Sequence, residues 1–369
     1  MFTKGNCLAV GDAMIPAVSF EDAVRDKLSP YINQIFSGNW EDNWDKLQQR
    51  RLLVEKKGPE VESVIPLIRR HGQETSILVG LFVPVSRESY AYMPQLRILG
   101  VSRAGYENVN VEEATRRGIA VCNVVGRNAQ AVSDFTIGLM LAECRNIARA
   151  HHAIANGQWK KEFANSDNIP ELRGKTIGII GFGHIGRLVA RKLAGFQVNI
   201  IVYDPNMSAG DIREAGCQPV DKETVFQCSD ILTLHARLTD ENSRLVGEPE
   251  LASMKPTSYL INTARAGLVD KEALLGALRA GHLAGAALDV FWEEPLDAAE
   301  ELLQMSNVTL TSHLAGTTRE ALTRSPQLLV DNILSLIEAG ESQSLINPEV
   351  LNDPELLQWL ANIRRTHLQ

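Results

Sequence analysis

Cysteine is scarce in this sequence, and its distribution excludes several kinds of site. The 369 residues include five cysteines, which stand far apart and form no C-x-x-C pair: Cys7, Cys122, Cys144, Cys217 and Cys228. An odd number of scattered thiols does not make a disulfide framework and offers no thiol motif for a zinc ion. We therefore expect a cytoplasmic protein without a bound metal.

Long apolar runs and a surplus of basic residues are also missing. No apolar stretch approaches the ~20 residues of a membrane-spanning helix, and the start of the chain lacks the apolar segment of a secretory signal. The formal net charge is −8, whereas proteins that bind duplex nucleic acid usually carry basic patches. Short basic clusters such as Arg69-Arg70 and Arg116-Arg117 are interpreted as solvated helix faces. The sequence thus predicts neither a membrane nor a nucleic-acid partner.

The length and the pattern of the first third predict an α/β protein of two domains. Apolar runs at 76–79, 96–101 and 119–122 are typical of strands, and polar stretches near 87–93 and 110–117 are typical of helices. Strands that alternate with helices indicate a parallel sheet covered by helices. The polar stretch 36–60 is interpreted as an inserted helix or loop, and the end of the chain as a polar tail.

A long helix and a regular alternation follow. Apolar residues at helical spacing predict one helix over 133–153. From residue 175 onward, short apolar strands separated by helical patterns predict a doubly wound sheet, the dinucleotide-binding architecture. The six expected strands are 176–180, 198–203, 230–234, 258–261, 285–290 and 308–311. A last helix is predicted over 319–339.

A glycine-rich turn joins the first of these strands to a helix. Gly181, Gly183 and Gly186 follow the apolar strand Ile177–Ile180 and open an apolar-periodic helix. In such a turn the first glycine permits the bend, the second lets the backbone approach a pyrophosphate, and the third lets helix and strand pack closely. The backbone N–H groups of the helix start favour the phosphates. A structural glycine turn without a ligand is the alternative.

The acidic residue at the end of the next strand favours NAD over NADP. Asp204 lies close to the spacing expected for the carboxylate that binds the adenine ribose hydroxyls. A carboxylate repels a 2′-phosphate, and no arginine follows in 205–208 to attract one. The cofactor predicted from the sequence is therefore NAD.

Several sequence segments, in the order in which they occur in the family, resemble the D-isomer-specific 2-hydroxyacid dehydrogenases. The resemblance covers roughly residues 78–350 and is densest in four segments: 172–181, 260–265, 285–291 and 311–316. It implies two Rossmann-like domains, with the cofactor domain (124–318) inserted into a discontinuous substrate-binding domain (1–123 and 319–369). It also implies a phosphoglycerate dehydrogenase-like oxidoreductase that transfers a hydride reversibly between NAD and a 2-hydroxy acid.

The resemblance assigns the reaction to a trio of residues. Arg265 would hold the substrate carboxylate and polarise the keto oxygen, as suits a guanidinium that is always charged. His313 would exchange the proton, because imidazole titrates near neutral pH. Glu294 would orient the imidazole and stabilise its charged form. His235 also ends a strand, and we place it near the nicotinamide rather than as the acid/base.

The same resemblance extends the cofactor site and supplies substrate loops. His184 and Ile185 would offer backbone N–H groups to the pyrophosphate. Thr263, Ala264, Asp289 and Gly316 would complete the cofactor site, with Asp289 at the nicotinamide carboxamide. The loops with Gly80 and Leu81 and with Arg103 and Gly105 would hold the substrate. Arg103 is either a grip for a phosphate or second acidic group, or a charge on the loop surface. The family usually has glycine directly after the arginine, where this chain has Ala266.

Two questions stay open at this point. The same fold occurs in eukaryotic corepressors that bind NAD to control assembly, so an interaction protein is the alternative to an enzyme. The identity of the 2-hydroxy acid is not fixed by these residues. Relatives often dimerise through the helix that begins at Ser133, and the resemblance therefore implies a homodimer.

Overall fold

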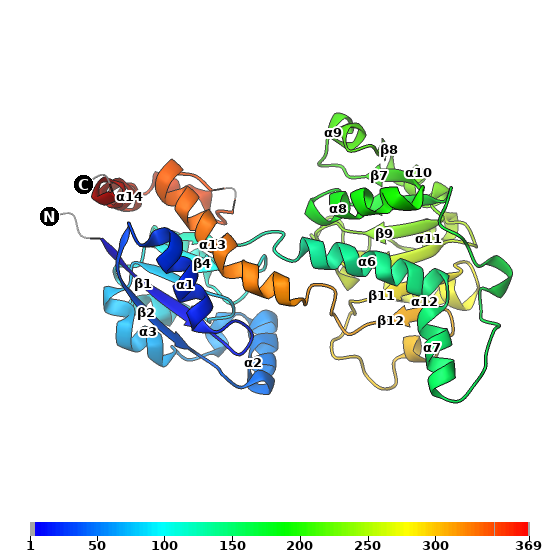
Figure 1. Ribbon diagram of the computed structural model, residues 1–369, viewed down its shortest axis with the longest axis horizontal. Coiled ribbons are helices and arrows are strands. Elements are labelled where there is room, and N and C mark those ends of the chain that lie inside the picture. Colours follow the sequence, from blue (N-terminus) through cyan, green and yellow to red (C-terminus); the bar gives the residue numbers. More distant parts are fainter. Residues whose placement is uncertain (1–3, 343, 368–369) are drawn as a thin grey trace. The chain divides into compact units, whose positions relative to one another are not determined.

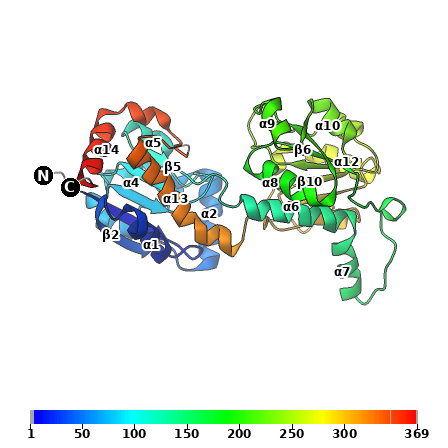
Figure 2. The ribbon, with the colours of Figure 1, turned by 45° about the horizontal axis from the view of Figure 1, so that its top comes forward.

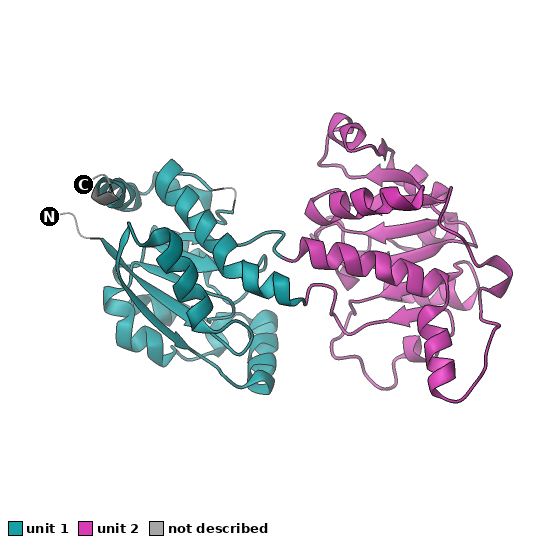
Figure 3. Ribbon diagram, in the orientation of Figure 1, with its two compact units in different colours: residues 1–127, 318–369 teal, residues 128–317 magenta. Residues whose placement is uncertain are grey.

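The computed structural model describes residues 4–342 and 344–367, which form two compact units. Unit 1 comprises residues 1–127 and 318–369, and unit 2 comprises the intervening residues 128–317 (Figure 3). Each unit has its own parallel sheet and its own apolar clusters. The predicted α/β fold class, with one doubly wound unit inserted into the other, is confirmed.

The sheet of unit 1 has five parallel strands in the order β2-β1-β3-β4-β5 (Figure 1). Their bounds are β1 Gly5–Gly11, β2 Ile32–Asn39, β3 Ile77–Gly80, β4 Ile98–Val101 and β5 Ala120–Cys122. Strands β3 to β5 lie where the sequence predicts them. The first two strands are additional, and the stretch predicted as an insertion holds the end of β2 and the helix α2 (Trp44–Lys57).

Helices cover both faces of this sheet. Successive residues of β1 alternate between two clusters: Cys7 and Ala9 belong to one, and Leu8 and Val10 to the other, because strand side chains alternate in direction. The first cluster includes side chains of α1 (Ala17–Leu28), α13 (Arg319–Ala339) and α14 (Pro354–His367). The second includes side chains of α3 (Pro66–His71), α4 (Arg87–Ala91) and α5 (Val111–Arg116).

The end of the chain is predicted to be a polar tail, and this prediction is wrong for residues 354–367, which form the helix α14. This helix buries Leu356, Leu360 and Ile363 in the same cluster as α13. These residues recur at i, i+4 and i+7, which is the spacing of one helix face. The prediction failed because these apolar residues stand singly among polar and charged ones, which hides their helical spacing.

The sheet of unit 2 has seven parallel strands in the order β12-β11-β10-β9-β6-β7-β8. The six predicted strands are present within two residues of their expected bounds, with a short seventh, β8, at the edge. They are β6 Thr176–Ile180, β7 Asn199–Tyr203, β8 Gln218–Pro219, β9 Ile231–Leu234, β10 Tyr259–Asn262, β11 Gly285–Leu288 and β12 Val308–Leu310. The strand order changes direction between β6 and β9, and in open α/β sheets ligands bind at the carboxyl ends around such a switch point.

Two layers of helices enclose this second sheet. Side chains of α6 (Ala129–Cys144) and α8 (His184–Leu193) share one cluster with Ile177 and Ile179 of β6. The other cluster holds side chains of α10 (Lys222–Cys228), α11 (Glu248–Ser253) and α12 (Lys271–Arg279). A shorter helix, α9 (Ala209–Glu214), precedes β8.

The single long helix predicted after Ser133 is wrong, because the structure has two helices there. Helix α6 ends at Cys144 and α7 (Ile147–Ala155) begins after Asn146, whose φ of 57° lies in the left-handed region. Asn146 is buried, and its amide donates to the side chain of Asn165 at 2.6 Å. Asparagine tolerates this backbone region better than most residues. Figure 2 shows α7 pointing away from the sheet of unit 2.

Candidate functional site

The glycine turn is packed too tightly for side chains at two of its three positions. Gly181 directly follows β6 and has a φ of 91°; a Cβ there would lie 2.4 Å from the backbone nitrogen of Ala236. A Cβ on Gly186 would lie 2.2 Å from the carbonyl oxygen of Gly181. The amide of His235, after β9, donates to the carbonyl of Ile180 at 2.7 Å. The turn therefore closes directly over the switch point of the sheet.

Gly183 differs from its two neighbours in the motif because it faces open space. A Cβ built on it meets no described atom within 4 Å. It is the N-cap of α8, and no side chain caps the N–H groups of that helix start within the described residues. His184 is exposed and Ile185 is partly exposed in the first turn. Such a glycine cradle with free N–H groups fits the pyrophosphate of a dinucleotide.

Asp204 stands at the end of β7, where the adenine ribose of such a cofactor would lie. Its Oδ2 accepts from the amide of Phe182 at 2.7 Å, and its Oδ1 accepts from the amide of Asn206 at 2.9 Å. The first of these bonds ties the carboxylate to the glycine turn itself. A carboxylate oxygen has lone pairs beyond one bond, so both oxygens can still accept from hydroxyls.

His313 and Glu294 form a hydrogen-bonded pair. Nδ1 of His313 lies 2.8 Å from Oε2 of Glu294, and the side chains are 51% and 30% exposed, respectively. The other carboxylate oxygen, Oε1, accepts from the amide of Phe291 at 3.0 Å. Glu294 is thus fixed at one oxygen and holds the imidazole with the other. The imidazole ring is therefore held through its Nδ1 atom.

Asp289 holds the loop that carries His313. Its carboxylate is buried and accepts three hydrogen bonds: from the Thr311 hydroxyl at 2.6 Å, the Leu314 amide at 2.9 Å and the Ala315 amide at 2.9 Å. His313 itself has a φ of 55°, which is uncommon for a residue other than glycine. The bonds on both sides of His313 keep it in that conformation. This contact was not foreseen, because a single aspartate after a buried strand gives no sign of which loop it will meet.

Arg265 follows β10 in a turn that Asn262 organises. The Asn262 side chain accepts from the Ala264 amide at 3.0 Å and donates to the Arg265 carbonyl at 3.0 Å. The Arg265 side chain is exposed, with Nη1 donating to the Ala264 carbonyl at 2.7 Å. Thr263 is buried, and its hydroxyl lies 2.9 Å from that of Thr136 on α6. The bracing by Asn262 was also not predicted from the sequence.

His235 lies in a different environment from His313. Its Nε2 lies 3.0 Å from the hydroxyl of Thr233. Burial lowers the pKa of His235 to about 3, so this ring is neutral at physiological pH. A neutral imidazole of that kind is a poor proton donor, whereas His313 is half exposed and paired with a carboxylate.

The structure brings most of the predicted residues to one edge of the second sheet. The glycine turn, Asp204, His235, Thr263 to Arg265, Asp289 and His313 all follow carboxyl ends of its parallel strands. Gly316 closes the His313 loop against Asn128, whose amide nitrogen would lie 2.3 Å from a Cβ on that glycine. The four residues of the predicted substrate loops belong to unit 1: Gly80 ends β3, Leu81 is buried after it, and Arg103 and Gly105 follow β4.

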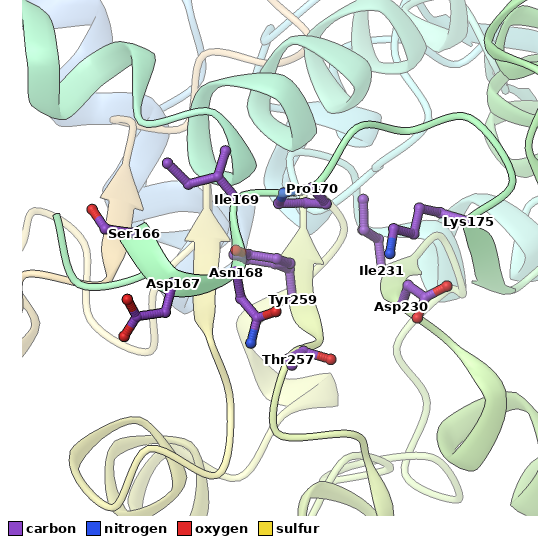
Figure 4. A pocket seen from close by; sticks show the side chains of 10 residues that line it. All are labelled: Ser166, Asp167, Asn168, Ile169, Pro170, Lys175, Asp230, Ile231, Thr257 and Tyr259. Carbon is purple, nitrogen blue, oxygen red and sulfur yellow. The ribbon is translucent and has the colours of Figure 1, made fainter. Parts of the chain in front are cut away.

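A hollow lies at the opposite edge of the second sheet, where the strands begin. Figure 4 shows its lining, which includes Lys175, Asp230 and Tyr259 at the starts of β6, β9 and β10. Asp230 accepts from the Thr176 amide at 2.8 Å and pairs with Lys255 at 2.9 Å. The carboxylate therefore secures strand starts, and none of the predicted site residues lines this hollow.

The sequence comparisons agree on one protein family. The sequence profile described as "D-isomer specific 2-hydroxyacid dehydrogenase, NAD binding domain" matches residues 137–315, which lie within unit 2. A glyoxylate reductase of Thermococcus litoralis is 36% identical over 312 residues, which span 83% of this chain and 93% of the relative. A D-3-phosphoglycerate dehydrogenase of Archaeoglobus fulgidus is 34% identical over 300 residues, 80% of this chain and 56% of the relative.

Solved structures agree in fold over nearly the whole chain. A glyoxylate reductase from Paecilomyes thermophila superposes with a TM-score of 0.69 at 26% identity, covering 95% of this chain and all of that one. Within residues 4–342 and 344–367, no helix is long and apolar enough to cross a membrane.

Proposed function

We propose that this chain, which belongs to the D-isomer specific 2-hydroxyacid dehydrogenase family, reduces a 2-oxo acid with His313 as proton donor and Arg265 as carboxylate anchor. It is an NAD-dependent oxidoreductase that acts on the CH–OH group of 2-hydroxy acids. The single observation that carries the residue assignment is the hydrogen bond from His313 to Glu294 at the carboxyl edge of the cofactor-binding sheet. A histidine at position 313 that was buried, or that had no carboxylate partner, would not support this assignment.

The cofactor supplies the hydride when it is bound. Gly181 to Gly186, with the first turn of α8, are the proposed contacts of its pyrophosphate, and Asp204 is the proposed contact of its adenine ribose. The open space at Gly183 supports this placement. His235, Thr263 and Ala264 follow neighbouring strands and are proposed to line the nicotinamide side.

The protein's own groups then act on the substrate. As the keto carbon is reduced, negative charge develops on its oxygen, and the imidazolium of His313 donates a proton there. The Glu294 carboxylate stabilises the charged ring and fixes its orientation, much as the aspartate of a Ser-His-Asp triad does. The Arg265 guanidinium offers a fork of N–H groups matched to the substrate carboxylate. In the reverse direction, neutral His313 accepts the proton of the hydroxyl.

A panel of 2-oxo acids tests the proposal. Purified full-length protein is mixed with NADH and glyoxylate, hydroxypyruvate, 2-oxobutyrate or 2-oxoglutarate, and NADH oxidation is followed by absorbance. We expect turnover with at least one of them and slower turnover with NADPH, because Asp204 repels a 2′-phosphate. Oxidation of none of them, by a folded protein that binds NADH, contradicts the proposal. The relatives are reductases and dehydrogenases, which favours the enzyme over an NAD-binding interaction protein.

We also propose that the protein is a homodimer, on the evidence of an exposed apolar surface. Three large apolar side chains on α7 and the segment after it are exposed: Ile147 (56%), Ile154 (53%) and Trp159 (81%). Ile147 and Ile154 are seven residues apart and therefore lie on one face of α7, and exposed apolar side chains grouped in this way often mark an interaction site. Light scattering should give twice the chain mass of 40.6 kDa, and a double substitution Ile154→Glu with Trp159→Glu should halve that value. A wild-type mass of 40.6 kDa at micromolar concentration contradicts the dimer.

A further inference from the structure

Asn262 is a buried residue at the end of β10 to which the proposed reaction assigns no role. Its side chain is 1% exposed, and β10 pairs with a strand on each side, β9 and β11. The sheet uses only the backbone of this residue, so the amide group of the side chain needs partners of its own. These partners show what Asn262 holds in place.

Both polar groups of the Asn262 side chain bind the turn that carries Arg265. The Oδ1 atom accepts from the amide of Ala264, and the Nδ2 group donates to the carbonyl of Arg265, each at 3.0 Å. The carbonyl of Ala264 in turn accepts from Nη1 of Arg265 at 2.7 Å. Asn262 therefore fixes the backbone on both sides of the carbonyl group that orients the guanidinium.

The guanidinium of Arg265 has little else to orient it. The side chain is exposed, and within residues 4–342 and 344–367 its one hydrogen bond is that to the Ala264 carbonyl. A long side chain in solvent has many rotamers, and selecting one of them costs conformational entropy. The geometry of the turn is thus what restricts the direction of the guanidinium.

The backbone of Asn262 connects the same turn with the loop of His313. The Asn262 carbonyl accepts from the amide of Asp289 at 3.0 Å. The carboxylate of Asp289 accepts from the amide of Leu314, the residue directly after His313, at 2.9 Å. The proposed anchor, Arg265, and the proposed proton donor, His313, are therefore both held from buried residues at the ends of the adjacent strands β10 and β11.

We propose that Asn262 is a positioning residue for Arg265, which holds the guanidinium in the orientation that receives the carboxylate of the substrate. This inference rests on the proposed function and makes it more specific. A paired guanidinium and carboxylate require directed N–H groups, and a small misplacement of such a group lowers the rate strongly. Loss of Asn262 therefore weakens the use of the 2-oxo acid and not the binding of the cofactor.

Asn262→Asp tests this role with the least change of shape. The carboxylate keeps an acceptor for the Ala264 amide but offers no N–H group to the Arg265 carbonyl. We expect kcat/KM for the best 2-oxo acid to fall at least tenfold, with a rise in KM, while the Kd of NADH stays within threefold of the wild type. Asn262→Ala removes both hydrogen bonds and should have the larger effect; if it does not fold, Asn262→Asp carries the test.

A second asparagine of unit 2 provides the matched control. The Asn307 side chain also donates to a backbone carbonyl, that of Leu278 at 3.2 Å, but it precedes β12 at the opposite edge of the sheet. Asn307→Ala should leave kcat/KM within twofold of the wild type. A kcat/KM of Asn262→Asp that also stays within twofold overturns the inference.

A double-mutant cycle separates positioning from a merely structural role. A residue that acts through Arg265 has no further effect once that guanidinium is removed. We expect Arg265→Gln alone to lower kcat/KM at least tenfold, and Asn262→Asp to lower it less than twofold more in the Arg265→Gln background. The full loss in that background overturns the inference and leaves Arg265 as the anchor. Unchanged kcat/KM in Arg265→Gln alone contradicts the proposed function, and the inference with it.

A binding measurement covers the case in which no 2-oxo acid is reduced. Oxamate carries the carboxylate of a 2-oxo acid beside an amide in place of the ketone. Full-length protein saturated with NADH is titrated with oxamate by calorimetry. A Kd that rises at least tenfold in Asn262→Asp, but not in Asn307→Ala, supports the inference even if turnover is absent.

Two results of this titration count against the inference. Equal oxamate affinity in the wild type and in Asn262→Asp overturns it, whether or not the enzyme turns over. Absence of oxamate binding, together with the absence of turnover, overturns the inference and the proposed function alike.

Discussion

The Nδ1 atom of His313 lies 2.8 Å from the Oε2 atom of Glu294, while the neighbouring Glu293 is exposed. The role of Glu294 can therefore be tested by substitution, with the same substitution at Glu293 as the control. Glu294→Gln removes the negative charge that stabilises the imidazolium. We expect kcat for 2-oxo acid reduction to fall at least tenfold at neutral pH.

The control variant is compared with the wild type by the same measurement of kcat. Glu293→Gln should leave kcat within twofold of the wild type. A kcat of Glu294→Gln that matches the wild type contradicts the role of Glu294.

Much of this site could be predicted from the sequence, because its residues follow strand ends in recognisable local patterns. The glycine turn, Asp204 and the strands of unit 2 depend on neighbours in sequence, and the structure has them where they were expected. The hydrogen bonds of Asp289 join segments far apart in sequence, because they link the residue after β11 to the loop after β12. Nothing in either segment alone shows that the two will meet.

The errors have physical causes as well. Asn146 divides the predicted long helix, since a left-handed residue ends the helical hydrogen bonding although the apolar spacing continues. The strand β1 was not predicted, because Gly5 and Asn6 weaken its strand propensity, and its burial on both faces removes the polar alternation.

Asp289→Asn tests whether Asp289 positions the His313 loop. The amide group replaces one acceptor oxygen by a donor, which then faces a hydroxyl or backbone N–H of that loop. Hydrogen bonds to a charged group contribute about 1.5–3 kcal/mol each. We expect kcat to fall at least tenfold while the Kd of NADH, measured by fluorescence titration, stays within threefold. A contact with the nicotinamide carboxamide, which the family resemblance implies, would instead raise the Kd by more than tenfold with kcat preserved at saturating NADH.

Gly183→Ala separates cofactor binding from folding. The new Cβ meets no described atom of the protein, so the free energy of unfolding in urea should change by less than about 1 kcal/mol. The methyl group would occupy the space proposed for the pyrophosphate, and the Kd of NADH should rise at least tenfold.

Two further glycines serve as controls for that experiment. Gly195→Ala also meets open space and should affect neither stability nor NADH binding. Gly186→Ala meets the carbonyl oxygen of Gly181 at 2.2 Å and should destabilise the protein by about 1–3 kcal/mol, the usual cost of overpacking. Unchanged NADH affinity in Gly183→Ala would place the pyrophosphate elsewhere.

Burial of His235 predicts a pH dependence of stability. Its pKa is lowered to about 3 in the folded protein, against about 6.5 in an unfolded chain. The unfolded state therefore binds a proton first as the pH falls, so this group's stabilisation is present above pH ~6.5 and is lost between there and pH ~3. Since the residue is partly accessible, we expect a loss on the order of 1 kcal/mol between pH 7 and pH 5.

Urea unfolding at the two pH values measures this contribution. His235→Gln should lose less stability than the wild type over that interval. His282→Gln, at an exposed histidine, should behave like the wild type. Identical pH slopes for all three proteins would show that His235 titrates normally in the folded state.

The most direct test of the account compares the wild type with His313→Gln in two assays: NADH oxidation with the best 2-oxo acid of the panel, and NADH affinity by fluorescence. General acid catalysis by a positioned side chain contributes about 10²–10⁴-fold. The account predicts that His313→Gln loses at least 100-fold in kcat while its NADH Kd stays within threefold of the wild type. A variant that binds NADH and retains more than a tenth of the wild-type kcat contradicts His313 as the proton donor.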